Sequence, residues 1–367
     1  MGFHCGIVGL PNVGKSTLFN ALTSVKAAAA NFPFTTIEPN VGIVQIPDPR
    51  LDRIGEFFHQ DVRIPAAITF VDIAGLVKGA SKGEGLGNQF LAHIRESHAI
   101  AHVVRCFEDP NIIHVSGSVD PMRDVEIINT ELMLADLDSV NKRYATIEKT
   151  ARAGMNKDAI AMFAVLSRVR AALEEGRPVR SLNLDENQTA LIKEFFLITN
   201  KKVMYIANVG DADGADPTAN PHVKKLAEYA SKEGAPVIPI CGKIESEITE
   251  LEAAEKLKFL ADYGMSEPGL DRVKRAGYEL LGLHNFFTAG DKQIKAWTIR
   301  KGTKAPQAAG VIHSDFERGF IRAEIYHYND LEKYKTEAAI KEAGLMRQEG
   351  KEYVVQDGDV IFFRFAV

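Results

Sequence analysis

The sequence contains few cysteines and no long hydrophobic run, and each absence excludes a class of protein. Only 3 of its 367 residues are Cys, and no two of them form a Cys-x-x-Cys pair, which argues against a disulfide framework and against a zinc site built from cysteines. Cys5, Cys106 and Cys241 each lie in or beside an apolar run, so we expect buried structural thiols. No apolar run approaches the ~18 residues that a membrane span needs, and the N-terminus carries no secretory or myristoylation signal. We therefore expect a cytoplasmic protein without a membrane partner.

A surplus of basic residues is lacking as well. The chain has 44 Lys and Arg against 49 Asp and Glu, which gives a net charge of −5 and a pI of about 6.1. This balance argues against an obligate nucleic-acid binder, and we expect no DNA partner. Hydrophobic residues make up 46% of the chain and charged residues 25%, as in an ordinary globular protein. At ~150 residues per domain, the length allows two or three domains.

Apolar runs of strand length alternate with helical stretches through most of the first 280 residues. This alternation predicts an α/β fold with a parallel sheet. Several of the runs are continuously apolar, as expected when helices cover both faces of the sheet. The candidate strands are Cys5–Leu10, Gly42–Ile46, Ala67–Asp72, Ala101–Phe107, Val203–Val209 and Pro236–Ile240.

Residues 126–202 interrupt the alternation with two long helical patterns. Apolar residues recur at spacings of three and four from Leu137 to Ala151 and again from Met162 to Leu173, with Gly154 between the two series. This pattern predicts an antiparallel helical hairpin with a coiled-coil-like seam. Between Val140 and Arg180 there are nine Lys or Arg and four acidic residues, a local charge of +5. A solvated helix face explains such a run, and contact with RNA is the hypothesis that it motivates.

The tail after Leu283 interrupts the alternation a second time. Gln293–Ile299, Phe320–Ile325 and Val360–Phe365 read as strands, and a helix is expected to start near Pro306. These elements predict a small α+β module. Basic residues gather where it begins, at Lys292, Lys295, Arg300, Lys301 and Lys304, and only Asp291 opposes them.

The strongest motif lies directly after the first predicted strand. Gly9–Thr17 (GLPNVGKST) fits G-x-x-x-x-G-K-[ST], and a predicted helix, Ser16–Leu22, follows it. The glycines let backbone N–H groups turn toward phosphates, and the helix N-terminus adds its dipole. Lys15 would bridge the β- and γ-phosphates, and the Ser16 hydroxyl would bind Mg²⁺. The motif therefore predicts a nucleoside triphosphate site.

Further Mg²⁺ and γ-phosphate contacts are expected from two other segments. The strand Ala67–Asp72 ends in Asp-x-x-Gly, which places Asp72 at the carboxyl end of a parallel sheet, where it can hold a Mg²⁺-bound water. Gly75 could offer a backbone N–H to the γ-phosphate and so sense hydrolysis. Either Thr35 or Thr36 could complete the Mg²⁺ shell, and spacing alone does not choose between them.

Base recognition is expected at the end of the fifth strand. Guanine-specific switches use Asn-Lys-x-Asp, whose carboxylate accepts hydrogen bonds from guanine N1–H and N2–H₂. Asn200–Val203 has the right beginning but lies before the strand, at the wrong end. Asn208–Asp211 (NVGD) follows the strand and keeps the Asn and the acid but lacks the Lys, and Cys241–Lys243 only loosely resembles the usual Ser-Ala-Lys loop.

With these residues in place, the chain resembles the YchF (Obg-like ATPase) family of P-loop NTPases. The resemblance covers essentially the whole chain, and its motifs are long and distinctive. They are Gly9–Thr17, Asn31–Asn40 (NFPFTTIEPN), Asp72–Asn88 (DIAGLVKGASKGEGLGN), Arg105–Glu108 (RCFE) and Ala305–Ala323 (APQAAGVIHSDFERGFIRA).

The resemblance implies a domain organisation and a set of site residues. It implies an Obg-type G domain over residues 1–282, a helical insertion at 126–202 within it, and a β-grasp module of the TGS type over 283–367. It also selects Thr36 as the metal-binding threonine. Nucleotide contacts are then expected at Asn12, Val13, Gly14, Lys15, Ser16, Thr17, Gly75, Asn208 and Asp211, and metal contacts at Ser16, Thr36 and, through water, Asp72.

The resemblance further implies binding of ATP at least as well as GTP and association with the ribosome, through the large subunit or its RNA. Family members usually have Glu where this chain has Asp211, and a GTP-specific switch is therefore an alternative. Ras-like switches carry a glutamine after Asp-x-x-Gly to orient water, and this chain has Leu76, so we expect slow intrinsic turnover. His114 and Lys15 are the catalytic candidates, and Asn12 is the residue that related switches use to hold K⁺.

Three functions remain open from the sequence. The first is a slow ATPase that acts as a nucleotide-dependent switch on the ribosome, in translation or a stress response. The second is a ribosome- or RNA-binding protein regulated by nucleotide, with incidental turnover, an alternative that Leu76 keeps open. The third, a metabolic P-loop kinase, ranks last because its lid would be rich in Arg and the inserted segment is predicted to pack as a hairpin. The oligomeric state cannot be read from the sequence.

Overall fold

The computed structural model of the chain describes residues 3–23, 40–73, 86–154, 156–214, 216–290 and 292–366. It divides into two compact units, one made of Met1–Gly42 with Thr69–Gly277 and the other of Ile43–Ile68 with Tyr278–Val367. This division reflects which residues pack together. The domain boundaries predicted from the sequence, 1–282, 126–202 and 283–367, stay predictions. None of the helices among the described residues is long and apolar enough to cross a membrane.

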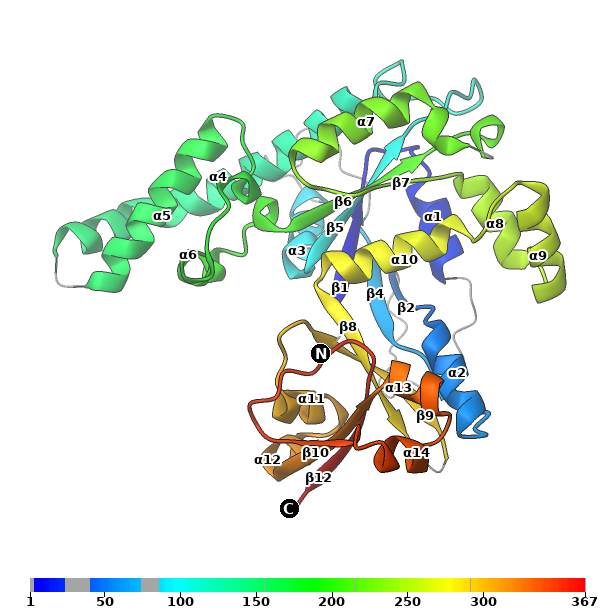
Figure 1. Cartoon of the computed structure of the whole chain (residues 1–367). Helices are drawn as coiled ribbons and strands as arrows, with labels where there is room; N and C mark the ends of the chain where they lie inside the picture. The colour runs from blue at the N-terminus through cyan, green and yellow to red at the C-terminus, as the bar shows by residue number, and fades with distance from the viewer. Residues whose placement is uncertain are drawn as a thin grey trace. The chain divides into compact units, whose positions relative to one another are not determined.

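A six-stranded sheet organises the first unit (Figure 1). Its order is β2-β4-β1-β5-β6-β7, and β1, β4, β5, β6 and β7 are mutually parallel. Each predicted strand is present, with ends that shift by at most two residues. The strands are β1 His4–Val8, β2 Val41–Gln45, β4 Ala67–Asp72, β5 Ala99–Arg105, β6 Lys202–Asn208 and β7 Val237–Ile240. The predicted α/β fold with a parallel sheet is confirmed.

The burial of the strands explains why they read as continuous apolar runs. All seven residues of β5 are buried, and so are six of the seven residues of β6. The chain goes from β1 to β2 on one side of β1 and, after β4, crosses to β5 on the other side, so the strand order reverses beside β1. The carboxyl ends of the strands at such a reversal are where open α/β sheets bind ligands. The P-loop begins at the carboxyl end of β1, so the topology itself places the phosphate site.

Helices connect the strands of this unit. α1 packs against α8, and α4 packs against α7. Their bounds are α1 Lys15–Thr23, α3 Leu86–Glu96, α7 Pro221–Lys232, α8 Gly242–Glu250, α9 Ala253–Asp262 and α10 Gly269–Leu280, and two short 3₁₀ turns follow β6 at η6 Asp211–Asp213 and η7 Pro217–Ala219.

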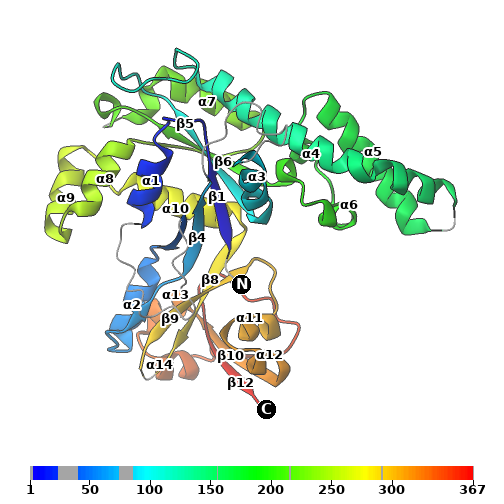
Figure 2. The ribbon, with the colours of Figure 1, turned by 180° about the vertical axis from the view of Figure 1, so that it is seen from behind.

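The predicted helical hairpin is present and consists of α4 (Pro121–Arg152) and α5 (Lys157–Glu174). The two helices lie side by side in both views of the ribbon (Figures 1 and 2). Their seam is a core of its own, in which Val140, Leu166 and Val169 are fully buried. Short helices lead back to the sheet, namely η3 Val179–Leu182, α6 Glu186–Leu191, η4 Lys193–Phe195 and η5 Ile198–Asn200.

The first helix of the hairpin begins earlier than the apolar pattern indicates. Asp120 caps α4, because its Oδ1 accepts hydrogen bonds from the backbone N–H groups of Met122 and Arg123 at 3.1 and 3.3 Å. Pro121 occupies the first helical position, where its missing N–H costs nothing. An Asp-Pro pair is thus the helix start that the seam pattern could not indicate.

One fully buried carboxylate binds the hairpin to the end of the segment that leads from α5 back to the sheet. Asp136 of α4 has no exposed surface. Its two oxygens accept hydrogen bonds from the backbone N–H groups of Ile198 and Thr199 at 2.8 and 2.7 Å and from the Thr199 hydroxyl at 2.7 Å. These three bonds satisfy the first groups of η5, which leads directly into β6.

The second unit contains another six-stranded sheet, of order β11-β10-β12-β8-β9-β3. Its core gathers Phe286, Ile325, Ile361 and a row of alanines from the helix Ala305–Ile312. The strands are β3 Arg63–Ile64, β8 Leu283–Ala289, β9 Ile294–Arg300, β10 Phe320–His327, β11 Arg347–Glu349 and β12 Asp359–Phe365. The helices are α2 Pro49–Phe57, α11 Ala305–Ile312, α12 Ser314–Arg318, α13 Tyr328–Tyr334 and α14 Glu337–Glu342. The predicted α+β module is therefore present, and its assignment to the TGS type stays a prediction.

Residues 43–68 belong to this second unit through polar contacts that no local pattern predicts. The Arg50 guanidinium donates to Asp48 at 2.8 Å and to Asp357 at 3.0 Å. The Asn285 amide of β8 donates to Asp48 at 2.9 Å. Asp48 therefore holds the segment before α2 against β8 through Asn285, and Arg50 holds the start of α2 against the turn before β12 through Asp357.

We predict that Asp136→Ala lowers the free energy of unfolding by about 3–5 kcal/mol, because two buried N–H groups and a hydroxyl lose their acceptor. The measurement is the urea midpoint of the first unit's unfolding. Asp138→Ala is the matched control two residues along the same helix, since the Asp138 side chain is 58% exposed and its loss should cost at most about 0.5 kcal/mol. Equal midpoints for the two variants would contradict the prediction.

Candidate phosphate-binding and base-binding site

The loop between β1 and α1 has the backbone that a phosphate cradle needs. Asn12 and Gly14 have φ angles of 61° and 90°, both in the left-handed region. A Cβ on Gly14 would lie 2.2 Å from the Asn208 side-chain nitrogen, so only glycine fits there. The Gly14 carbonyl accepts from the Leu18 N–H at 3.0 Å and so opens the helix α1. The helix N-terminus thus points its free N–H groups into the loop.

Lys15 and Asp72 meet at the end of the sheet. The register pairs Ile7 of β1 with Asp72 of β4, which brings the carboxylate level with the start of the loop. Lys15 Nζ lies 3.1 Å from Asp72 Oδ1, and the two side chains are only 9% and 11% exposed. The predicted position of Asp72, at the carboxyl end of its strand, agrees with this geometry, and its part in holding Mg²⁺ stays a prediction.

The remaining phosphate and metal candidates divide between described and undescribed residues. Ser16 and Thr17 are exposed in the first turn of α1, and Val13 is buried beneath the loop. Thr36, Gly75 and Leu76 lie outside the described residues.

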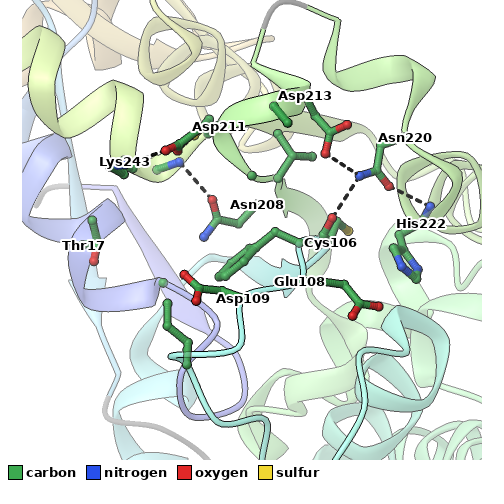
Figure 3. A pocket seen from close by; sticks show the side chains of 18 of the residues that line it. Thr17, Cys106, Glu108, Asp109, Asn208, Asp211, Asp213, Asn220, His222 and Lys243 are labelled. Atoms are coloured by element: carbon green, nitrogen blue, oxygen red, sulfur yellow. Dashed lines mark hydrogen bonds and ion pairs between the residues drawn. The ribbon is translucent and has the colours of Figure 1, made fainter.

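A cavity of about 750 Å³ opens beside the P-loop (Figure 3). Its wall is built from the P-loop and from the segments that follow β5, β6 and β7. The lining residues include Asn12, Gly14, Thr17, Phe107, Asn208, Asp211, Asn220 and Lys243. Because those three strands all end here, the cavity lies where a parallel sheet presents its carboxyl ends.

Asn208 joins two walls of this cavity. Its side-chain nitrogen donates to the Val13 carbonyl at 2.9 Å, and its side-chain oxygen accepts from the Gly242 N–H at 2.9 Å. The residue is buried. A single amide therefore fixes the distance between the P-loop and the start of α8.

Asp211 lies at the rim of the cavity and is paired. Its Oδ2 lies 2.5 Å from Lys243 Nζ, and its Oδ1 accepts from the Cys241 thiol at 3.4 Å. The hydrogen bond from Lys243 lowers the pKa of Asp211 and raises that of Lys243. Burial raises the pKa of the Cys241 thiol to about 11, so this thiol is protonated at neutral pH and can serve as the donor.

Arg105, which lies in a family motif but was predicted no role from the sequence, is the last residue of β5 and contacts the loop that follows it. Arg105 is 2% exposed, and its guanidinium donates to the backbone carbonyls of Phe107 and Ile112 at 3.0 Å each. The same loop returns to the P-loop, because the Ile113 carbonyl accepts from the Asn12 side-chain nitrogen at 3.1 Å. Arg105 thus shapes a loop that touches the phosphate cradle. Its place in the Arg105–Glu108 motif was the one sequence signal for this role.

His114 follows directly in this loop and is buried, at 8% exposure. Its Nε2 lies 2.8 Å from Asp124 Oδ2, and its Nδ1 accepts from the Ser116 N–H at 3.0 Å. This acceptor role leaves Nε2 as the protonated nitrogen, which donates to Asp124. Both ring nitrogens are therefore engaged within the protein, and its catalytic role stays a prediction.

The donor set beside the P-loop suits a hard cation that also binds phosphate. Ser16 offers a hydroxyl and Asp72 a carboxylate, and Mg²⁺ prefers oxygen ligands and keeps several waters. Among the described residues, no group of three or more His, Cys, Asp or Glu side chains could hold a metal ion alone. Mg²⁺ would therefore depend on substrate phosphates for its remaining ligands, as in other P-loop sites.

Comparison with known proteins agrees with this geometry. Residues 4–164 match a family model described as a 50S ribosome-binding GTPase. Residues 283–366 match a model for the C-terminal part of YchF GTPases, described as a protein of unknown function.

Curated relatives match the chain over its full length. The chain is 56% identical to the "Ribosome-binding ATPase YchF" of Bacillus subtilis and 55% identical to that of Escherichia coli O157:H7, each over 100% of both chains. A solved structure, "Structure of the Schizosaccharomyces pombe YchF GTPase", superposes with a TM-score of 0.89 at 40% identity and covers 99% of this chain and 98% of that one. The chain is thus a P-loop NTPase, and it belongs to the YchF family.

Proposed function

We propose that the protein is a ribosome-associated P-loop ATPase that hydrolyses ATP, and GTP more weakly, to the diphosphate and phosphate. The observation that carries the proposal is the Lys15–Asp72 ion pair at 3.1 Å. It lies beside the cavity, next to a P-loop whose Asn12 and Gly14 have left-handed backbone conformations. Full-length relatives named ribosome-binding ATPase support the nature of the partner and of the substrate. Such a protein would act in the cytoplasm.

In this proposal the P-loop residues bind the phosphates. Lys15 contacts the β- and γ-phosphates, and the backbone N–H groups from Asn12 to Thr17 surround them. Bound Mg²⁺ supplies charge neutralisation at the γ-phosphate. Ser16 and Thr36 would be its direct protein ligands, Asp72 would hold one of its waters, and Gly75 would sense the γ-phosphate.

Base recognition falls to Asn208 and Asp211. Asn208 lends shape to the pocket through its bonds to Val13 and Gly242, and Asp211 stands at the rim with both oxygens engaged. A carboxylate that is already paired is a poor partner for guanine, so we infer a preference for ATP. The GTP-specific switch is the competing function, since an acid is present at the fourth motif position.

The ribosome is proposed as a partner through its large subunit or RNA, and the basic hairpin is a candidate contact. Contact with phosphates would release counterions and make binding sensitive to salt. A nucleotide-regulated ribosome-binding protein with incidental turnover is the second candidate function, because the chain has Leu76 where a water-orienting glutamine would stand.

We predict that ATP binds at least tenfold more tightly than GTP in a competition titration and that added ribosomes raise the rate of ATP hydrolysis strongly. A tenfold preference for GTP would overturn the proposed substrate. Turnover that is indifferent to ribosomes, with ribosome co-sedimentation intact at low salt, would favour the nucleotide-regulated binding protein.

We predict that His114→Ala lowers the rate of ATP hydrolysis by about 10²-fold, the lower range for loss of an acid–base group, while ATP affinity stays unchanged. For His114 to meet a water near the phosphates, one of its hydrogen bonds to Asp124 and Ser116 must break. The exposed His59, which lies in the second unit, supplies the control His59→Asn. The proposal for His114 fails if the two variants hydrolyse ATP equally fast.

We predict faster hydrolysis in KCl than in NaCl at equal ionic strength. Asn12 donates through its side-chain nitrogen to Ile113, which leaves its side-chain oxygen facing away from that bond and able to accept a cation. The rate ratio between the two salts should fall to about one in Asn12→Ala. Identical rates in both salts for the unmodified chain would exclude K⁺ as a cofactor.

A further inference from the structure

A buried histidine–aspartate pair lies in the loop after β5 and at the start of α4, and the proposed function uses only its histidine. The Ile113 carbonyl accepts from the Asn12 side chain of the P-loop, and His114 is the next residue. Its Nε2 lies 2.8 Å from Asp124 Oδ2, and the two side chains are 5% and 3% exposed. Asp124 belongs to the first turn of α4. The pair therefore joins a loop that contacts the P-loop to the first helix of the hairpin.

The hydrogen bonds of His114 determine which ring nitrogen can accept. The Ser116 backbone N–H can only donate, so Nδ1, which lies 3.0 Å from it, carries no hydrogen. The neutral ring then carries its hydrogen on Nε2 and donates it to the carboxylate of Asp124. The nitrogen that can accept a hydrogen bond or a proton from a water is therefore Nδ1.

Of these two hydrogen bonds, the one from Ser116 is easier to exchange for a water. Ser116 is exposed, so solvent can satisfy its N–H after the bond breaks. Asp124 is buried, and its carboxylate would lose a charge-assisted hydrogen bond that solvent does not replace. A buried charge that loses its partner is strongly destabilising. When Nδ1 turns to a water, the bond between Nε2 and Asp124 is therefore the one that stays.

We propose that Asp124 is a positioning residue for ATP hydrolysis, which holds His114 through Nε2 so that Nδ1 accepts a proton from the attacking water. This inference rests on the proposed function, in which His114 is the acid–base group. The water oxygen bonds to the γ-phosphorus, and one water proton passes to Nδ1. The bond from the γ-phosphorus to the bridging oxygen breaks, and its electron pair leaves with the diphosphate. Nδ1 then returns its proton to the released phosphate, and until then the Asp124 carboxylate faces the positive charge of the ring.

The variant Asp124→Asn changes the tautomer of His114, because Arg123 determines how the new amide lies. Arg123 Nη2 lies 3.5 Å from Asp124 Oδ1 and can only donate. The amide oxygen therefore takes the position beside Arg123, and the amide NH₂ group faces His114 Nε2. A donor at this place moves the ring hydrogen to Nδ1, which can then no longer accept from water. The variant thus keeps the size of the side chain and reverses the tautomer.

The first test measures kcat and KM for ATP hydrolysis in single and double variants. We expect Asp124→Asn to lower kcat about tenfold, the effect of losing a group that orients a functional histidine, and to leave KM within about twofold. In the His114→Ala background the same substitution should change kcat less than about twofold, because a positioning residue acts only through the residue that it holds. Asp120→Asn is the matched control, since it makes the same change at the cap of α4, where Asn serves as well as Asp.

The second test observes the tautomer by long-range proton–nitrogen correlation NMR of the full chain with isotope-labelled histidine. The His114 signal is the one that disappears in His114→Ala. We expect the ring hydrogen on Nε2 in the unmodified chain and in Asp120→Asn, and on Nδ1 in Asp124→Asn. Unchanged signals from the other histidines show that each variant is folded.

The inference is overturned if Asp124→Asn changes kcat less than about twofold, if it lowers kcat by the same factor with and without His114, or if the ring hydrogen stays on Nε2. The same measurements separate it from the proposed function. If His114→Ala hydrolyses ATP at the full rate, the proposed role of His114 fails, and the role of Asp124 fails with it. If His114→Ala slows hydrolysis and Asp124→Asn does not, only the inference about Asp124 fails.

Discussion

The nucleotide site depends on the two hydrogen bonds of one buried amide. Asn208 holds the Val13 carbonyl on one side and the Gly242 N–H on the other. It therefore joins two segments whose strands, β1 and β7, have β5 and β6 between them in the sheet order. Gly14 is required by the same contact, because any side chain there would collide with Asn208. The phosphate-binding loop and the proposed base-binding residues are thus held together by the same side chain.

The parts of this site that the sequence predicted have local signals. The P-loop is a contiguous motif, Asp72 ends an apolar run, and Asn208 ends another. Each prediction therefore needed only the rule that parallel strands end at one edge of the sheet. The strand β4 was predicted to the residue, with its end at the Asp72 of the Asp-x-x-Gly motif.

The parts that the sequence did not predict depend on distant partners. Arg105 donates to backbone carbonyls, whose chemistry is the same at every residue, so no sequence pattern marks them. The Lys243–Asp211 pair joins residues 32 apart. Strand β8 was not predicted because His284 and Asn285 break its apolar run, and the polar partners of Asn285, which include Asp48 and Asp357, lie in other segments of the chain. Strands β3 and β11 have two and three residues, too few for a period to show.

The ion pairs of the hairpin show how many of its basic side chains are already engaged within the protein. Three of its basic residues pair within one helix turn, at Lys142–Asp138, Arg152–Glu148 and Arg170–Glu174. Ion pairs of this kind stabilise a solvent-exposed helix internally. The nine basic side chains are therefore not all available to a partner, and an RNA contact would depend on lysines such as Lys149 and Lys157, for which the described residues show no ion pair.

Helix α4 gives the hairpin a mechanical connection to the nucleotide site. Near its start it carries Asp124, which binds His114, and the helix, 32 residues long in all, ends at Arg152 at the far end of the hairpin. At 1.5 Å per residue this is a rod of about 48 Å. A tilt of about 5° around Asp124 would displace the distant end by about 4 Å, roughly the separation of two neighbouring strands. A small rearrangement around His114 would therefore cause a large displacement at the far end of the hairpin. Conversely, a force applied to that end would be transmitted through α4 to His114.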